Sequence, residues 1–230
     1  VRSDARSRLV TATAAFNNYA YIDSGREIST YVTGPDGQPL NPNPLRDARV
    51  RRALSMALNR AALSERAMEN GAVPSNQIAP PGFNGHDPSL PPLAYDPARA
   101  RALLAEAGYP QGFGLTIHCT SNRFAGDARV CQAVGQMFTA IGIRTEVEAI
   151  PTAIFFRRGA SGGPNRTPEY SVSLSMFATT TGMAAEGMTS LIRSYNPQLG
   201  HGASNRGRYS DTVLDGLLTW DAVAVPDVVA

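Results

Sequence analysis

Three polar stretches of this sequence carry residue types that could bind a solute. Each is expected in a loop, and two of the loops follow a predicted strand. Their polar residues are Asn122 and Arg123 in residues 120–124, Thr179 and Thr180 in residues 178–182, and Asn205 and Arg206 in residues 202–209. Phe177, the last residue of the strand before the second loop, is a further candidate. Guanidinium, amide and hydroxyl groups donate hydrogen bonds, so together they suit a small polar or anionic ligand. In open α/β sheets, ligands bind at the carboxyl ends of the strands.

Residues typical of metal sites and of covalent catalysis do not cluster in the sequence. His86, His118 and His201 stand far apart, and none is one helical turn from another metal-ligating residue. Residues 159–163 read Gly-Ala-Ser-Gly-Gly but lack the flanking strand of a nucleophile elbow, and the glycines of residues 200–207 lack the spacing of a phosphate-binding loop. We therefore expect no metal and no cofactor. A hydrolase or transferase domain with its site at the same strand ends remains the alternative, because a catalytic group assembled from distant residues leaves no local pattern.

The middle of the chain predicts the layers that would position these loops. Residues 115–119 and 143–150 are predicted strands, and the helical pattern of residues 128–141 lies between them. A strand–helix–strand unit favours two parallel strands. Residues 170–177 alternate and add another strand. The expected fold class is therefore α/β, with a mixed sheet flanked by helices.

Two consecutive helices are predicted over residues 47–71, and we expect them to pack on this sheet. Asp47 and Asn59 are the expected N-caps, and Gly71 is the expected left-handed stop. Asp96 and Pro97 begin a further helix that Gly108 ends. The apolar stripe of the first helix consists of Val50, Ala53, Leu54, Ala57 and Leu58.

The remaining segments are assigned more briefly. Residues 1–45 are predicted to be extended, with strands near residues 16–22 and 27–33, and residues 46–230 to form one α/β unit. Residues 154–158 suggest a short helix and residues 159–163 a surface turn. A short helix is expected to end within residues 191–195, and the last helix to begin at residues 209–211 and run through Leu218.

Composition limits the classes of function. The 230 residues include 43% apolar and 17% charged residues and carry a net charge of +2. This balance predicts a globular protein and argues against a nucleic-acid partner, which needs a concentrated basic surface. No apolar run reaches the roughly 18 residues of a membrane span. The sequence begins in the middle of a residue pattern and stops just after a short apolar stretch, so we expect a piece of a longer protein.

The sequence contains two cysteines, Cys119 and Cys131. Two buried or half-buried thiols are favoured over a disulfide between a strand end and the next helix.

Several motifs in this order resemble those of the family 5 extracellular solute-binding proteins, the peptide and nickel-complex receptors of ABC importers. The first is Asp-x-Arg-Val-Arg-x-Ala-Leu-x-x-Ala-Leu-Asn-Arg, at residues 47–60, and the second is the Tyr-Asp-Pro segment at residues 95–113. The strand, Asn-Arg-Phe loop, Gln-Ala-Val-x-Gln-Met helix and Ile-Gly-Ile turn of residues 115–150 follow. Residues 203–210 and the Asp-x-Leu-Leu at residues 215–218 complete the resemblance. It covers residues 16–218.

The resemblance implies roles for particular residues. Arg123 would face a ligand carboxylate, with a surface arginine or a bridge to Asp127 as the open alternative. Phe177 would replace the tryptophan that floors the pocket, with a core aromatic at the end of the strand as the open alternative. Thr180 and Met183 stand where relatives place an acidic residue for a peptide ammonium. No carboxylate is therefore expected there, which argues against a free dipeptide, because a buried ammonium needs a counter-charge.

The resemblance also implies the setting of the protein. This chain would be one lobe, the second, of a two-lobe periplasmic-binding-protein-like fold, and the first lobe of the same protein would close on it around the solute. The function would be to capture a peptide-like or other small polar solute and deliver it to the membrane subunits of an ABC permease. The protein would be a monomer and not an enzyme, located in the periplasm or lipid-anchored outside the cytoplasmic membrane.

Overall fold

Five strands form one mixed β-sheet within residues 14–219, the residues that this computed structural model describes. β1 pairs with β5, β5 with β3, and β3 with both β2 and β4. β3 is parallel to β4 and β5, whereas the β1–β5 and β2–β3 pairs are antiparallel. The predicted mixed sheet and parallel crossover are therefore confirmed. The strands are β1 (Phe16–Ile22), β2 (Val32–Thr33), β3 (Gly114–Thr120), β4 (Arg144–Ile150) and β5 (Val172–Ala178).

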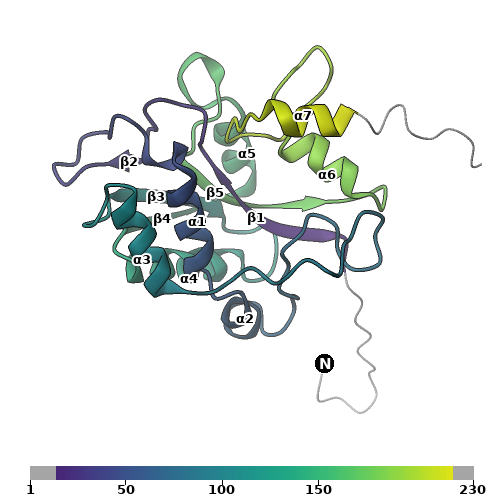
Figure 1. Cartoon of the computed structure of the whole chain (residues 1–230), viewed down its shortest axis with the longest axis horizontal. Coiled ribbons are helices and arrows are strands. Elements are labelled where there is room, and N and C mark those ends of the chain that lie inside the picture. Colours follow the sequence, from purple (N-terminus) through teal and green to yellow (C-terminus); the bar gives the residue numbers. More distant parts are fainter. Residues whose placement is uncertain (1–13, 220–230) are drawn as a thin grey trace, which may run out of the picture.

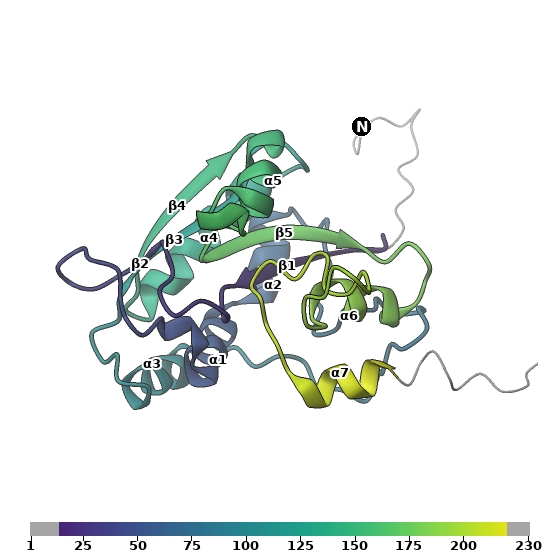
Figure 2. The same ribbon diagram turned by 90° about the horizontal axis from the view of Figure 1, so that it is seen from above.

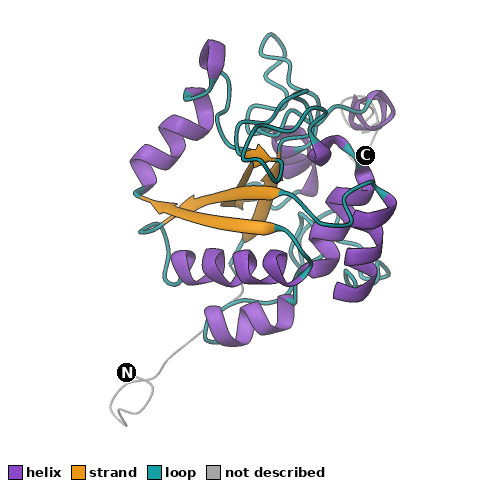
Figure 3. Ribbon diagram, turned by 90° about the vertical axis from the view of Figure 1, so that its left-hand side faces the viewer, coloured by secondary structure: helices purple, strands orange, loops and turns teal. Residues whose placement is uncertain are grey.

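Helices cover both faces of this sheet (Figure 3). Figure 1 shows α4 and α5 on opposite sides of the strands, and Figures 1 and 2 both place α6 beside α7 and away from α3. The α-helices are α1 (Ala48–Ala57), α2 (Arg60–Ala62), α3 (Pro97–Glu106), α4 (Asp127–Ala140), α5 (Thr152–Ser161), α6 (Ala184–Leu191) and α7 (Thr212–Thr219). A π-helical turn, η2 (Leu63–Ala67), continues α2, and the 3-10 turns are η1 (Pro44–Arg46) and η3 (Pro164–Arg166).

The two faces of the sheet differ in chemistry. Successive side chains of a strand point to opposite faces, so Ile117 and Cys119 join an apolar core that includes residues of α1, α3 and α4. His118 points the other way, in register with Ser173 of β5, which pairs with Tyr21 of β1. This second face is thus lined by buried polar and aromatic groups, and it is the face from which the candidate site is built.

Local sequence rules account well for the helix ends. The side chains of Asp47, Asn59 and Asp96 accept backbone N–H groups of α1, α2 and α3 at 2.7, 2.9 and 2.8 Å. Gly108 has a φ of +95° after α3. These predicted caps and stop are confirmed. The predicted stripe of the first helix packs into the core, with Val50, Ala53, Leu54 and Ala57 buried and Leu58 partly buried.

The stop expected at Gly71 is wrong. The helical run ends at Ala67, and the left-handed residues are Glu69 and Asn70, with φ values of 52° and 60°. The helix ends earlier in the sequence than predicted because its last turn is a π turn, in which the Met68 N–H donates to the Leu63 carbonyl at 3.0 Å. Gly71 instead allows its own backbone to lie close to that of Met68, since a Cβ on residue 71 would lie 2.8 Å from the Met68 carbonyl oxygen.

The strand expected over residues 27–33 is also mostly wrong, because only β2, two residues long, forms there. The preceding residues fold around the buried carboxylate of Asp23. Arg26 donates to Asp23 at 2.6 Å, and the Ser29 hydroxyl donates to it at 2.5 Å. A buried carboxylate needs such partners, so the segment turns instead of extending. Of the predicted extended segment 1–45, residues 1–13 lie outside the described residues.

Of two expectations about the second half of the chain, one needs correction and the other is confirmed. The surface turn expected over residues 159–163 is wrong at its start, because α5 continues to Ser161 and Gly159 is buried. A Cβ on Gly159 would lie 3.1 Å from the Tyr170 ring, so the glycine allows the helix to pack closely there. The short helix expected to end within residues 191–195 ends at Leu191, the last residue of α6.

Candidate ligand-binding site

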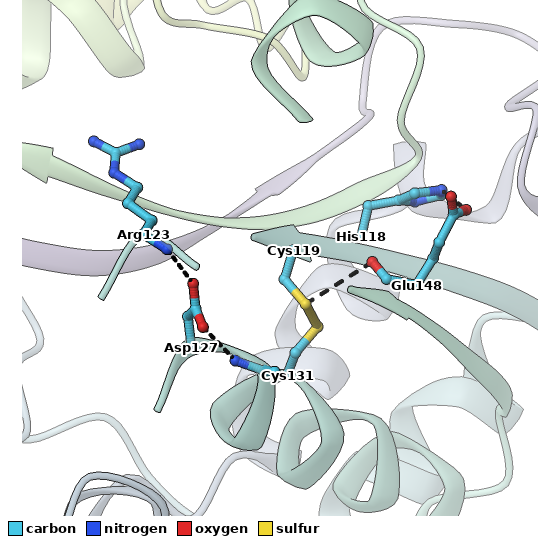
Figure 4. The surroundings of a disulfide bond; sticks show 7 residues. His118, Cys119, Arg123, Asp127, Cys131 and Glu148 are labelled. Carbon is cyan, nitrogen blue, oxygen red and sulfur yellow. Dashed lines mark hydrogen bonds and ion pairs between the residues drawn. A yellow bond between two sulfur atoms is a disulfide. The ribbon is translucent and has the colours of Figure 1, made fainter. Parts of the chain in front are cut away.

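The loop after β3 carries Arg123 and is held at both ends. The Ser121 N–H donates to the Ile150 carbonyl at 2.9 Å, and Asp127 accepts the backbone N–H of Arg123 at 2.8 Å. Asp127 is thus used by the backbone of the loop and not by the guanidinium, so the alternative of an Arg123–Asp127 side-chain bridge is not what the structure contains. Figure 4 shows the guanidinium of Arg123 pointing away from Asp127.

A disulfide ties the base of the same loop. Cys119, at the end of β3, is bonded to Cys131 in α4, with a Cα–Cα distance of 6.3 Å (Figure 4). The expectation of two separate thiols is therefore wrong. Both residues face the apolar core, with exposures of 2% and 0%. The strand end and the next helix pack together there, so the two side chains meet across a separation of 12 residues.

Two predicted ligand-binding residues, Arg123 and Arg206, meet at one aromatic ring. The guanidinium carbon of Arg123 lies 4.6 Å from the centroid of Phe156 in α5, and that of Arg206 lies 5.0 Å from the same centroid. Arg206 also lies 5.6 Å from the ring centroid of Tyr21 in β1. The Nη1 atoms of both arginines are buried and have no hydrogen-bond partner. The structure therefore brings the first and third predicted loops together on the polar face of the sheet.

Tyr19 and Tyr21 lie beside this arginine pair. Their rings are in edge-to-face contact, with centroids 4.7 Å apart, and their hydroxyls are hydrogen-bonded to each other. Burial raises the pKa of Tyr21, while its hydrogen bond with Tyr19 and the charges of Arg206 and Arg123 act in the opposite direction. Burial also raises the pKa of Tyr19. Both tyrosines are consequently neutral at physiological pH.

The two predicted asparagines have structural contacts. Asn122 accepts the backbone N–H and the hydroxyl of Thr152 at 2.9 and 2.8 Å, and so caps the start of α5. Asn205 is buried, and its amide donates to the carbonyls of Arg193 and Tyr209 at 3.0 and 2.7 Å. Each asparagine therefore positions an element that carries part of the arginine pair: α5 with Phe156, or the loop with Arg206.

Two further predicted ligand-binding residues, Thr179 and Phe177, lie at the end of β5 and in the loop that follows it. Thr179 is buried and its hydroxyl has no hydrogen-bond partner. Phe177 lies next to α6, with its ring 3.8 Å from the position that a Cβ on Gly187 would occupy. Phe177 is only partly buried and is not part of the apolar core. It pairs with Asn17, two residues before Tyr19, and therefore lies on the same face of the sheet as the two tyrosines.

A carboxylate from α6 lies beside Thr180, although residues 180 and 183 themselves carry none. Glu186, in the first turn of α6, accepts the Thr180 hydroxyl at 2.8 Å. It also accepts the N–H and the hydroxyl of Thr181, each at 2.8 Å. These hydrogen bonds, that of the Thr181 N–H foremost, lower the pKa of Glu186. The carboxylate is therefore ionised and already engaged in holding the start of α6.

A second ionic cluster lies on the same face of the sheet. Arg158 pairs with Glu148 at 2.6 Å and with Glu169 at 2.7 Å, and these hydrogen bonds lower the pKa of both carboxyls. His118 Nε2 lies 2.9 Å from Glu148, and burial lowers the pKa of His118 (Figure 4). The His118 ring is fully buried and stacks on Tyr170, with centroids 4.2 Å apart. The imidazole itself is therefore closed to solvent, whereas its partner Glu148 is partly exposed.

Sequence reasoning missed Phe156 and the two tyrosines of β1. The adjacent pair Phe155-Phe156 was the available signal, because one of two neighbouring aromatics on an amphipathic helix faces away from the core. Phe155 is buried against Tyr170, whereas Phe156 is only partly buried.

Residues 14–219 contain no helix long and apolar enough to cross a membrane. Within that range we also find no group of three or more His, Cys, Asp or Glu side chains arranged to hold a metal.

The architecture matches that of known binding proteins. The Escherichia coli murein tripeptide binding protein MppA aligns with a TM-score of 0.69 at 17% identity, covering 93% of this chain and 37% of that one. DppA from Helicobacter pylori, solved in complex with the peptide STSA, aligns with a TM-score of 0.66 at 20% identity, covering 88% and 37%. At these identities the likeness establishes the fold, and it confirms the expected class.

Sequence comparison gives the family. The glutathione-binding protein GsiB of Escherichia coli (strain K12) is 37% identical over 107 residues, which make up 46% of this chain and 20% of GsiB. The chain thus matches only about a fifth of the length of this curated relative. The model of the bacterial extracellular solute-binding proteins, family 5 Middle, matches residues 5–198. Because this match covers most of the sequence, the chain belongs to the family 5 bacterial extracellular solute-binding proteins.

Proposed function

We propose that the protein containing this chain is the substrate-binding component of an ABC import system. It captures a peptide-like or other small polar solute and delivers it to the membrane subunits of a permease. The family supports this role, and the observation that carries it for this chain is the arginine pair at Phe156. Two buried guanidinium nitrogens without a partner suit a ligand that arrives with the missing acceptors.

The chain is proposed to form the second lobe of the protein, with β1 and β2 in the same sheet. The first lobe of the same protein supplies the other wall of the cleft and closes on the solute by a hinge motion. A one-sided surface is a poor binding site, since good pockets bury most of the ligand. The protein acts as a monomer in the periplasm, or lipid-anchored outside the cytoplasmic membrane. The Cys119–Cys131 disulfide fits such an oxidising compartment.

The solute is proposed to be peptide-like and to bear a carboxylate. GsiB is named for glutathione and DppA was solved with a peptide, which favours this class. Binding without catalysis is the better interpretation, because the imidazole of His118 is fully buried and in contact with the rings of Tyr31 and Tyr170. General acid–base catalysis requires a titratable group within reach of the substrate.

Substitution of Arg123 in the full-length protein tests the proposal. Arg123→Ala removes a charge-assisted hydrogen bond worth roughly 1.5–3 kcal/mol, so affinity for a carboxylate solute should fall roughly tenfold to a hundredfold. Arg123→Lys keeps the charge but loses the planar fork, and should cost less. Calorimetric titration measures both, with Arg157→Ala as the matched control, because Arg157 is exposed on the helix that carries Phe156. Wild-type affinity in both Arg123 variants would show that Arg123 does not contact the solute.

A further inference from the structure

The partly buried arginines of residues 14–219 differ in the partners of their guanidinium groups. Arg26 and Arg158 are partly buried, and each is paired with a carboxylate: Arg26 with Asp23 at 2.6 Å, and Arg158 with Glu148 at 2.6 Å. Arg123 and Arg206 are partly buried as well, yet no carboxylate of residues 14–219 pairs with either, and the Nη1 atom of each is buried without an acceptor. Arg51, Arg60 and Arg208 are also partly buried and have no carboxylate partner within residues 14–219, but each donates to a backbone carbonyl. The buried Nη1 atom without any acceptor therefore distinguishes Arg123 and Arg206 from the other arginines of that range.

The groups around the pair do not neutralise it. Tyr19 and Tyr21 stay protonated, because burial raises both pKa values, and their hydroxyls bond each other. The face of the Phe156 ring attracts cations only weakly. Asp127 is the carboxylate nearest in sequence to Arg123, and it binds the backbone N–H groups of Arg123 and Ala128 instead. Among the residues that the structure describes, two positive charges consequently share one ring with no carboxylate paired to either.

Such an arrangement is unfavourable in isolation. Both guanidiniums lie within cation–π distance of one ring, roughly 6 Å, so the like charges are close enough to repel each other. Buried charged groups also require hydrogen-bond partners. Gly159 leaves room for the guanidinium of Arg206, since a Cβ there would lie 3.3 Å from Arg206 Nη1. The backbone thus holds Arg206 close to α5, next to the ring that Arg123 also contacts.

We propose that Arg123 and Arg206 form one subsite that binds two negative charges of a single ligand. This inference rests on the proposed solute-binding function and specifies its ligand class: a solute with two carboxylates, or with a phosphate group. Each guanidinium presents a planar fork that matches one carboxylate or two oxygens of a phosphate. A monoanion leaves one guanidinium unpaired. The subsite therefore selects dianionic solutes over monoanionic analogues of the same shape.

The test uses the full-length protein and three probes in calorimetric titrations at low salt. The probes are the peptide alanyl-alanyl-glutamate, its isostere alanyl-alanyl-glutamine, which has one carboxylate fewer, and inorganic phosphate. We expect the wild type to prefer the dicarboxylate peptide over its isostere at least tenfold, as one additional charge-assisted hydrogen bond predicts. If phosphate binds tightly and neither peptide does, the subsite is one for phosphate.

The Arg206→Gln variant identifies the residue responsible. It should reduce the preference for the dianion to less than about threefold, while Arg157→Gln, with the same loss of charge at an exposed site, should leave the preference intact. Arg206→Lys serves if Arg206→Gln fails to fold, and it should lower the preference by an intermediate factor.

An unchanged preference in the Arg206 variants overturns the inference and leaves the proposed function standing. The inference is likewise overturned, with the proposed function intact, if the wild type binds none of the probes yet retains another solute. A wild type that binds no solute at all would refute both proposals.

Discussion

Reduction of the Cys119–Cys131 disulfide should destabilise the lobe without dismantling it. The bridge joins residues separated by 12 positions, and the loop-entropy relation gives about 3 kcal/mol for a loop of this size. Both cysteines are buried in the core, so the reduced sulfurs remain packed and no cavity is created. With an m-value of about 2–3 kcal/mol/M, the urea midpoint of the reduced protein should fall by about 1 M.

The measurement compares urea unfolding of the oxidised and reduced full-length protein, with the Cys119→Ala/Cys131→Ala double variant as a third sample. The double variant should not respond to reductant and should be somewhat less stable than the reduced wild type, because it also loses two buried sulfurs. Solute affinity should fall less than tenfold, since Asp127 and Ser121 still hold the loop that carries Arg123. Equal midpoints for oxidised and reduced protein, with two titratable thiols in the untreated sample, would refute the reasoning.

Two further predictions concern residues that position the site. Asn122→Ala removes the side-chain cap of α5, so the free energy of unfolding should fall by about 1 kcal/mol, as measured by urea unfolding; an unchanged midpoint would mean that the cap is dispensable. The hydrogen bonds from Arg158 lower the pKa of Glu169, so the stability from this pair is present above the ordinary pKa of 4.5 and is lost as the pH falls below it. Glu169→Gln should therefore weaken the protein at pH 7 and flatten the fall in its melting temperature on acidification, and parallel melting curves of variant and wild type would contradict this.

Features governed by neighbouring residues could be predicted from the sequence. The caps at Asp47, Asn59 and Asp96 follow from side chains that reach N–H groups two or three residues away. The crossover through β3, α4 and β4 follows from apolar patterns within one stretch of chain. In each case the deciding interactions lie within one continuous segment of the sequence.

Features decided by distant contacts could not be predicted in this way. The segment expected as a strand before β2 turns because Ser29 bonds Asp23 and also Ser171, which lies 142 positions away. The thiols of Cys119 and Cys131 pair because β3 and α4 pack together. For the site, the sequence indicated Arg123 and Arg206 as separate candidates, but only the packed fold places both on the ring of Phe156.

Native mass spectrometry of the full-length protein, purified from its own host without a denaturing step, tests the central claim most directly. If the protein is a solute receptor, the spectrum should show one small solute per protein molecule, lost on collisional activation. Rebinding of the identified solute should stabilise the unliganded protein, and Arg123→Ala should reduce the fraction of protein that carries it. A protein that retains no solute, and that no peptide or small organic anion stabilises against heat, would contradict the account.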